Sequence, residues 1–148
     1  MKSILASISQ PKEIQNLNLK ELTQLAEECR QRIIEVTSQR GGHLASSLGT
    51  VELTVALLKN FDFSMDRIVW DVGHQAYPYK ILTDRNEKFD TLGKSGGIKK
   101  FLSRDESSYD HFGAGHASTS ISAALGMAIG RDLQQKKHRV IAVIGDGA

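Results

Sequence analysis

The chain has 148 residues, of which 40% are apolar and 24% are charged, and its formal net charge at pH 7 is +2. This length suits one domain, or most of one, with a sizeable core. The small net charge and the dispersed basic residues argue against a nucleic-acid-binding protein. No apolar run is long enough to span a bilayer, which argues against a membrane protein.

The start of the chain and its cysteine content point to a reducing compartment. Residues 1–10 hold one lysine, a short apolar stretch and no convincing cleavage site, so a secretory signal is not expected. The single cysteine, Cys29, cannot form an internal disulfide or build a cysteine metal cluster. It falls on the apolar face of a predicted helix, where we expect it to pack in the core.

A long helix is predicted after residue 17. Asn18 stands three residues before Glu21, a pattern close to the capping box that begins a helix. Gly41 and Gly42 are expected to end this helix. Between them, apolar side chains recur at spacings of three and four on one helical face: Leu19, Leu22, Leu25, Cys29, Ile33 and Val36.

Short elements alternate with small-residue loops in the middle of the chain. In chain order, the predicted features are a loop at 43–49, an apolar helix at 51–58, a strand at 67–70, a break at 71–74 and a helix at 76–82. Pro78 must then lie in the first turn of its helix, where proline is tolerated.

The last third of the chain completes an α/β pattern. Residues 83–110 form a polar, weakly periodic connection of the kind that is functional or mobile. A helix at 118–134 carries small side chains that allow close packing on a sheet, and residues 140–144 predict a buried strand of a parallel sheet. The basic run at 136–139 is interpreted as a solvated helix end. The alternation predicts an α/β fold, with a mainly parallel sheet flanked by helices.

Four small-residue loops at element ends carry the candidate functional side chains. Three place a histidine after a glycine, at His43, His74 and His116, and the fourth carries Asp146. Glycine gives the backbone freedom to present an imidazole into a cleft, and imidazole can move a proton near neutral pH. A carboxylate beyond the carboxyl end of a parallel strand lies where α/β proteins bind ligands, and it suits a Mg²⁺ ion shared with a phosphate.

Other ligands fit these loops less well. Zinc on the three histidines is disfavoured by spacings of 31 and 42 residues, which are not a local ligand pattern. Residues 113–119 are not a dinucleotide fingerprint, because Ser118 replaces the third glycine, and no Gly-Lys-Ser/Thr makes them a P-loop. Their free amides at a helix start still suit an anion. A phosphate held through a metal at Asp146 is therefore favoured.

Together these motifs resemble the amino-terminal part of the 1-deoxy-D-xylulose-5-phosphate synthases, thiamine-diphosphate enzymes of the transketolase superfamily. The resemblance begins near Leu17 and covers nearly all of the remaining chain. Its motifs are residues 42–46, 71–78, 112–116 with 118–126, and 145–148. The string at 71–78 is highly specific, whereas Gly-Asp-Gly alone indicates only a thiamine-diphosphate enzyme.

The resemblance implies an activity and its cofactors. The family joins pyruvate to glyceraldehyde 3-phosphate, releases CO₂ and makes 1-deoxy-D-xylulose 5-phosphate, which feeds isoprenoid, thiamine and pyridoxal synthesis. The expected cofactors are thiamine diphosphate and Mg²⁺. The expected parent is a homodimer without nucleic-acid or membrane partners, in the bacterial cytoplasm or, if processed, in the plastid stroma.

The resemblance also assigns roles to single residues. Asp146 is expected to bind Mg²⁺, and His43 is expected to assist proton transfer or to bind substrate phosphate near the reacting centre. The remaining expected cofactor-binding residues are His74, Gly115, His116, Ala117, Gly147 and Ala148. The chain departs from the family pattern at Ala117, where serine is usual, and at His111.

The resemblance divides the chain into an arm and an incomplete domain. Residues 1–17 are expected to form an extended or irregular arm around Pro11, and residues 18–148 a partial diphosphate-binding domain. The family's second metal ligand, its activating glutamate and its pyrimidine-binding domain are absent from the sequence. The 148 residues alone are therefore expected to be inactive and to bind cofactor weakly.

Two alternative functions remain open at this point. One is a neighbouring thiamine-diphosphate enzyme such as a transketolase, against which the string at 71–78 argues. The other is a non-catalytic, truncated module that binds partners.

Overall fold

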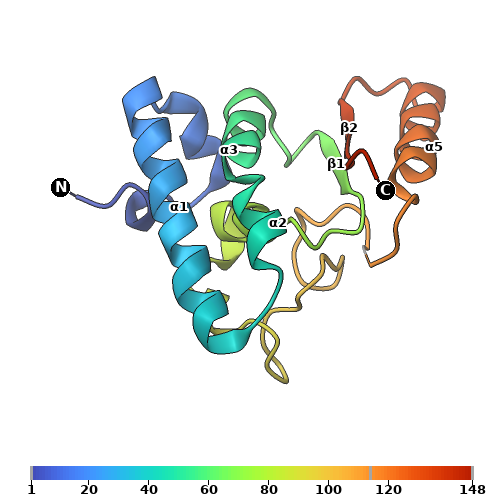
Figure 1. The fold of residues 1–148 in the computed structure, drawn as a ribbon. Helices are drawn as coiled ribbons and strands as arrows, with labels where there is room; N and C mark the ends of the chain where they lie inside the picture. Colours follow the sequence, from blue (N-terminus) through green and yellow to red (C-terminus); the bar gives the residue numbers. More distant parts are fainter. Residues whose placement is uncertain (1, 114, 148) are drawn as a thin grey trace. The chain divides into compact units, whose positions relative to one another are not determined.

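The computed structural model describes residues 2–113 and 115–147, which form two compact units. The first unit runs up to Phe61 and includes His74–Lys100, and the second comprises Asp62–Gly73 and the chain from Phe101 onward. Helices dominate the first unit, and the second holds a parallel pair of strands with a helix beside it (Figure 1). The predicted α/β fold class is confirmed.

The longest helix of the first unit is α1, Leu19–Arg40, and the sequence sets both of its ends. The Asn18 side chain accepts a hydrogen bond from the Glu21 amide at 3.1 Å, and the Glu21 carboxylate accepts one from the Asn18 amide at 2.8 Å. This completes the predicted capping box. Gly41, at φ +65°, ends the helix. Cys29 is fully buried, as predicted, and burial raises the pKa of its thiol to about 12.

The amino-terminal segment contains two short 3₁₀ helices, η1 (Leu5–Ser7) and η2 (Pro11–Asn16). The carboxylate of Glu28, on α1, accepts a hydrogen bond from the Leu5 amide at 2.7 Å, and Ile14 is fully buried. The prediction of an extended or irregular arm is therefore wrong over these two ranges. Packing of η1 on α1 and of η2 on α3 decides the local conformation.

Three further helices of the first unit pack against α1: α2 (Leu44–Leu48), α3 (Val51–Asn60) and α4 (Tyr77–Lys80). The prediction of a loop over residues 43–49 is wrong, because five of these residues form α2. The helices α3 and α4 lie where they were predicted, with Pro78 in the first turn of α4. A π-helical turn, η3 (Ile81–Arg85), continues α4.

The polar connection at residues 83–110 is held by buried apolar side chains. In the first unit Phe89, Leu92 and Ile98 are buried, and in the second unit Leu102 is buried. Beyond the end of η3 and a short 3₁₀ helix, η4 (Phe89–Thr91), this stretch consists of turns and irregular structure. These buried side chains attach the segment to the rest of the chain at several positions. The mobility expected for this segment stays a prediction.

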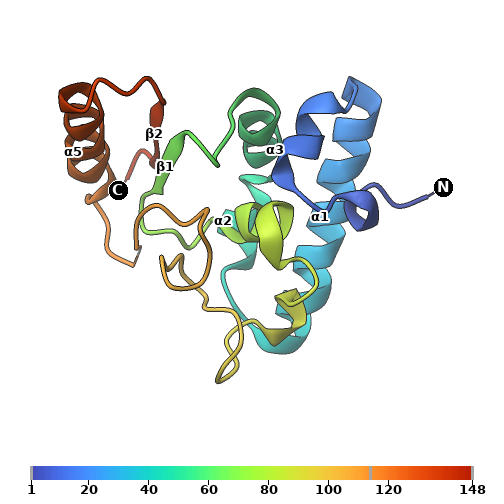
Figure 2. The same cartoon turned by 180° about the vertical axis from the view of Figure 1, so that it is seen from behind.

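In the second unit, β1 (Arg67–Trp70) pairs in parallel with β2 (Val140–Val143), with Arg67 opposite Val140. Helix α5 (Ser120–Leu133) packs against both strands and runs beside them in both views (Figures 1 and 2). The expectation of a buried strand at 140–144 is wrong, because every residue of β2 is half-exposed. Within the described residues, β2 has a neighbouring strand on one side only.

The second unit exposes both basic and large apolar side chains. Lys136, Lys137 and Arg139 are exposed, as predicted, but they lie in the connection between α5 and β2 rather than on the helix. Large apolar side chains of α5 are also exposed, at Ile121, Leu125, Ile129 and Leu133. Over residues 2–113 and 115–147, no helix combines the length and the apolarity needed to cross a membrane.

Candidate functional site

The two candidate histidines of the first unit lie together. The ring centroids of His43 and His74 are 5.7 Å apart, with the ring planes at 77°. The hydroxyl of Tyr77 accepts a hydrogen bond from the His43 backbone N–H at 3.3 Å, and the two rings lie 6.1 Å apart. Because Tyr77 is fully buried, this contact anchors the histidine pair to the core of the unit.

The glycine before His43 is required by close packing. Gly42 has φ +140°, and a Cβ atom at this position would stand 2.6 Å from the hydroxyl oxygen of Tyr77. A side chain would therefore have to displace a buried ring, and the left-handed φ disfavours it as well.

A side chain of helix α2 and the residue Thr50 hold the backbone at the second histidine, His74, and at the residue after it. The hydroxyl of Ser47, a fully buried residue, donates a hydrogen bond to the His74 carbonyl at 3.1 Å. The Thr50 hydroxyl donates to the next carbonyl, that of Gln75, at 2.7 Å. Within the described part of the chain, the buried Nδ1 atom of His74 has no hydrogen-bond partner, so a bound group could supply one.

The environment of His43 favours a neutral ring. Burial, followed by the nearby His74 and Lys100, lowers the pKa of the His43 imidazole. A neutral imidazole can accept a proton, and the imidazolium so formed can return it. Burial also raises the pKa of Tyr77, which keeps its hydroxyl protonated. This corner is therefore suited to proton transfer.

In the second unit, the carboxyl ends of β1 and β2 lie side by side. The Asp71 amide, just beyond β1, donates a hydrogen bond to the Val143 carbonyl at 2.8 Å. Residues 145–147 follow β2, and Asp146 is exposed there. Ligands of open α/β sheets bind at this edge. The metal-binding role expected for Asp146 stays a prediction.

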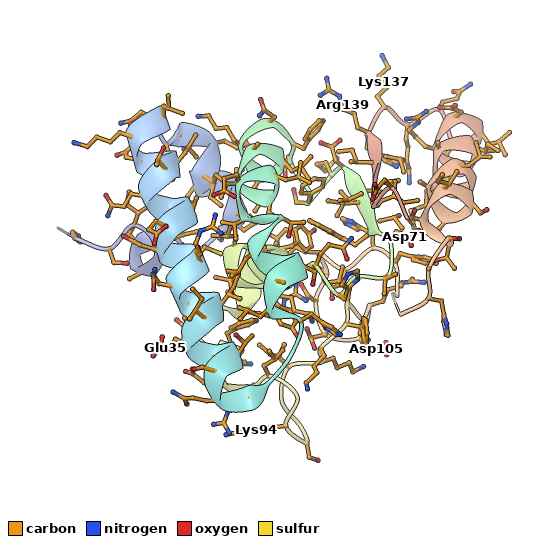
Figure 3. The ribbon with its side chains drawn as sticks, viewed as in Figure 1. Glu35, Asp71, Lys94, Asp105, Lys137 and Arg139 are labelled. Atoms are coloured by element: carbon orange, nitrogen blue, oxygen red, sulfur yellow. The ribbon has the colours of Figure 1, made fainter. Side chains whose placement is uncertain are left out.

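Asp71 binds the loop that leads into α5, and Figure 3 labels its place at the end of β1. Its carboxylate accepts hydrogen bonds from the Ser118 amide at 2.9 Å and from the Ser120 amide at 3.1 Å. The Ser120 side chain and these amides lower the pKa of Asp71. Of the amides at residues 113–119 that were predicted to be free for an anion, that of Ser118 is not free, because Asp71 accepts its hydrogen bond; anion binding by the others stays a prediction. An acidic residue directly after a strand was the sequence signal for this role.

The glycine-rich loops of the second unit leave their backbone open. Gly115 has φ +144°, and no heavy atom of another described residue lies within 4 Å of a Cβ placed at Gly113, Gly115, Gly145 or Gly147. His116 and Ala117 are exposed, whereas Ala148 lies outside the described residues. In the described ranges no group of three or more histidine, cysteine or acidic side chains could hold a metal ion. A divalent ion at Asp146 would need further oxygen ligands, such as those of a diphosphate.

These features define an α/β protein with glycine-rich loops at the carboxyl ends of its parallel strands. It also has a pair of histidines, one of which is hydrogen-bonded to a buried tyrosine. A family model described as 1-deoxy-D-xylulose-5-phosphate synthase matches residues 5–148. The chain belongs to the 1-deoxy-D-xylulose-5-phosphate synthase family.

Curated proteins with that name are similar along the chain. The protein of Clostridium perfringens is 58% identical, and that of Carboxydothermus hydrogenoformans 59% identical, over 148 residues, which are 100% of this chain and 24% of each relative. The protein of Thermosynechococcus vestitus is 54% identical over 144 residues, 97% of this chain and 23% of the relative. The chain thus spans about a quarter of the length of these relatives.

Proposed function

We propose that this chain is the amino-terminal part of a 1-deoxy-D-xylulose-5-phosphate synthase. The homodimeric enzyme would condense pyruvate with glyceraldehyde 3-phosphate, releasing CO₂ and forming 1-deoxy-D-xylulose 5-phosphate. One observation carries this proposal: the parallel pairing of β1 and β2 sets Asp71 and residues 145–147 at one edge, in a chain that matches the family over residues 5–148. The names of the curated relatives support the same reaction.

We propose that this edge holds the diphosphate of thiamine diphosphate together with Mg²⁺. Asp146 would bind the metal, since carboxylate oxygens suit Mg²⁺. The open backbone at the glycine positions fits a diphosphate that is bound by main-chain N–H groups. Other contacts would come from His74, Gly115, His116, Ala117, Gly147 and Ala148. When bound, the cofactor supplies the carbanion stabilisation that decarboxylation requires.

His43 is proposed to handle a proton or to bind the substrate phosphate. Its lowered pKa favours the neutral ring, which is the form that accepts a proton. Its backbone is fixed to Tyr77, and its ring lies beside that of His74. A fixed imidazole beside a second imidazole favours a role in proton transfer.

The activity test is pyruvate-dependent release of CO₂ in the presence of glyceraldehyde 3-phosphate, thiamine diphosphate and Mg²⁺, with the protein as its gene encodes it. Asp146→Asn is expected to lower the rate about 100-fold or more, because the metal stabilises charge by several kcal/mol. Asp105→Asn, another exposed acid of the second unit, is the matched control and is expected to keep full activity. Activity with ketose phosphate donors but not with pyruvate would indicate a transketolase instead.

We also infer that residues 1–148 alone are inactive and bind the cofactor weakly. Magnesium favours a nearly octahedral set of oxygens, and one carboxylate with loop backbone holds it poorly. Calorimetry with this polypeptide is therefore expected to show weak binding of thiamine diphosphate with or without Mg²⁺. Tight, magnesium-dependent binding would contradict the inference.

A further inference from the structure

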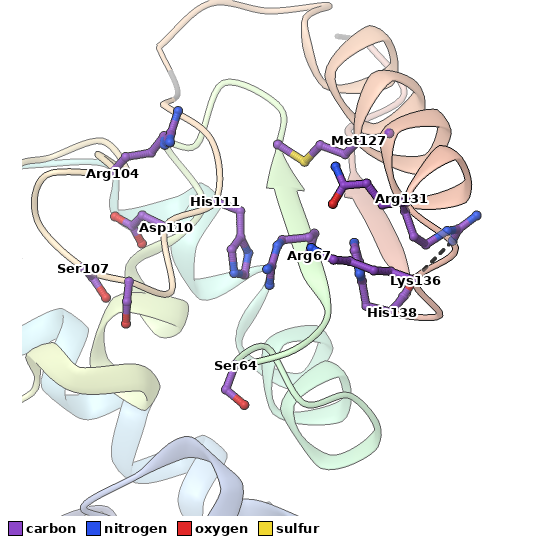
Figure 4. Close-up of a pocket in the computed structure, with 13 residues that line it drawn as sticks. Ser64, Arg67, Arg104, Ser107, Asp110, His111, Met127, Arg131, Lys136 and His138 are labelled. Carbon is purple, nitrogen blue, oxygen red and sulfur yellow. Dashed lines mark hydrogen bonds between the residues drawn. The ribbon is translucent and has the colours of Figure 1, made fainter.

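A second site is indicated by a pocket in the second unit, at the other end of the strands from Asp71 and Asp146 (Figure 4). Its volume is about 550 Å³. Arg67, the first residue of β1, lines it together with His138, which stands two residues before β2. A strand rises about 3.3 Å per residue. The pocket is thus separated from the proposed cofactor edge by the length of the strands.

The pocket is strongly cationic. Within the described part of the chain, one carboxylate, that of Asp110, lines it, against four cationic side chains: Arg67, Arg104, Arg131 and Lys136. The Asp110 side chain accepts a hydrogen bond from the Ser103 amide at 2.9 Å. The cations come from the start of β1, the connection before α5, the last turns of α5 and the segment that follows it. The fold therefore gathers charges that are dispersed in the sequence.

Two histidines in the pocket wall are affected by this positive charge. Burial, and then Arg67, Arg131 and Lys136, lowers the pKa of His138, while Asp66 acts in the opposite direction. Burial and Arg67 lower the pKa of His111 to about 4. The Nδ1 atom of His111 accepts a hydrogen bond from the Ile68 amide at 3.1 Å, so this ring is held in its neutral form. Burial is the larger cause of both shifts, and the nearby cations lower both pKa values further.

Two of the cations are fixed by the fold. Arg131 donates to the His138 carbonyl at 3.2 Å, drawn as a dashed line in Figure 4, and pairs with Asp132 at 2.8 Å. Arg67 donates to the Met65 carbonyl at 2.8 Å.

The other two cations, Arg104 and Lys136, are available to a ligand. Both are exposed, and over residues 2–113 and 115–147 their side chains have neither a hydrogen bond nor an ion pair. The pocket thus combines an ordered cationic wall with two cations that can close on a ligand.

We propose that this pocket binds a small phosphate-bearing anion, either inorganic phosphate or a phosphate monoester. Guanidinium groups match the geometry of phosphate oxygens and bind them through paired hydrogen bonds, and a lysine adds a point charge. Ser108 and Gln134 line the same pocket and add neutral donors. A phosphate group fills a small part of the volume, so the organic part of an ester also fits. The site is distinct from the proposed cofactor edge and does not depend on it.

The test measures phosphate binding by ³¹P NMR line broadening, with the protein as its gene encodes it and with thiamine diphosphate and Mg²⁺ present throughout. Lys136→Gln is expected to weaken phosphate binding about fivefold, as for a partly exposed charge pair, and adding Arg104→Gln is expected to weaken it further. Lys137→Gln is the matched control: it removes the neighbouring exposed lysine, which does not line the pocket, and is expected to leave binding unchanged. Binding is also expected to weaken as salt is added.

A second arm uses glycerol 1-phosphate as the monoester. Tighter binding of the ester would assign the site to an ester, and equal binding would assign it to free phosphate; in both cases the variants must weaken binding alike. No measurable binding, or binding that the double variant leaves unchanged, would overturn the proposal. Failure of the proposed enzymatic function would appear in the CO₂ assay and not in this titration.

Discussion

The carboxylate of Asp71 accepts a hydrogen bond from the backbone amide of Ser118 at 2.9 Å, across 47 positions of the sequence. The residue after β1 thereby fixes the loop that leads into α5. Ser118 itself has φ +63°, a backbone conformation that non-glycine residues rarely adopt. The hydrogen bond that the Ser118 amide donates to Asp71 helps to hold this conformation, which affects where Gly115, His116 and Ala117 present their backbone.

Asp71→Asn is expected to loosen this loop. The asparagine keeps one acceptor oxygen but turns an NH₂ group toward one of the two amides, so one charge-assisted hydrogen bond is lost. Hydrogen exchange at the Ser118 and Ser120 amides is expected to become about tenfold faster or more. Asp105→Asn is the control and should leave the exchange of these amides unchanged. Unaltered protection in Asp71→Asn would show that the carboxylate does not hold the loop.

Gly42→Ala and Gly41→Ala form a matched pair that tests the corner before His43. A Cβ atom at Gly42 meets the buried Tyr77 hydroxyl, whereas one at Gly41 meets no atom within 4 Å in the described part of the chain. We expect Gly41→Ala to cost about 1–2 kcal/mol, because a positive φ combined with an extended ψ suits glycine and few other residues. Gly42→Ala should cost about 1–3 kcal/mol more, because overpacking adds to the strain. Paired urea titrations measure the difference, and equal costs would contradict the close approach to Tyr77.

Ser47→Ala is expected to lower the free energy of unfolding by about 1 kcal/mol, the contribution of one buried hydrogen bond. It leaves the His74 carbonyl without the donor that lies 3.1 Å away. Ser46→Ala is the control, since its hydroxyl lies 3.5 Å from the same carbonyl, at the limit of a hydrogen bond. Thermal unfolding of the two variants measures the contrast. An equal loss of stability in Ser46→Ala and Ser47→Ala would contradict the assignment of the Ser47 hydroxyl as the donor to the His74 carbonyl.

His111 is expected to make stability depend on pH. Its pKa falls to about 4 in the folded chain, so the unfolded chain binds a proton more readily. The stabilisation is complete above the unfolded pKa, about 6.5, and is lost as the pH falls toward 4. The loss should be about 2 kcal/mol, with allowance for solvent screening of a half-exposed ring.

An NMR titration of the His111 ring, assigned by comparison with His111→Gln, measures this pKa directly. The ring is expected to stay neutral through pH 5.5. A midpoint near 6.5 would contradict the burial of His111 against Arg67 and the Ile68 amide.

The helices and strands with local signals could be predicted from the sequence. The pairing of Asn18 with Glu21 marks the start of α1, and Pro78 marks the first turn of α4, as the structure confirms. The short helices α2, η1 and η2 could not be predicted, because each is fixed by contacts with distant residues. In α2, for example, Ser47 is held by the carbonyl of His74.

The positions of some candidate residues follow from the sequence: Asp146 lies after β2, and His43 and His74 each follow a glycine at the end of an element. Their roles in a site stay predictions. The contact between the rings of His43 and His74 could not be predicted, because the two residues are 31 positions apart in the sequence. The position of His43 also depends on a hydrogen bond to Tyr77. The role of Asp71 was missed because its place after a strand marks it as a candidate but does not identify its partner, which lies 47 positions away. The cationic pocket was missed for the same reason, since its arginines come from separate segments.

Magnesium-dependent binding of thiamine diphosphate, measured by calorimetry on the protein as its gene encodes it, tests the proposed cofactor edge most directly. The unaltered protein and Asp105→Asn are expected to bind the cofactor tightly when Mg²⁺ is present and weakly when it is removed. Asp146→Asn is expected to bind weakly in both conditions. Tight, magnesium-dependent binding by Asp146→Asn would contradict the assignment of this carboxylate to the metal.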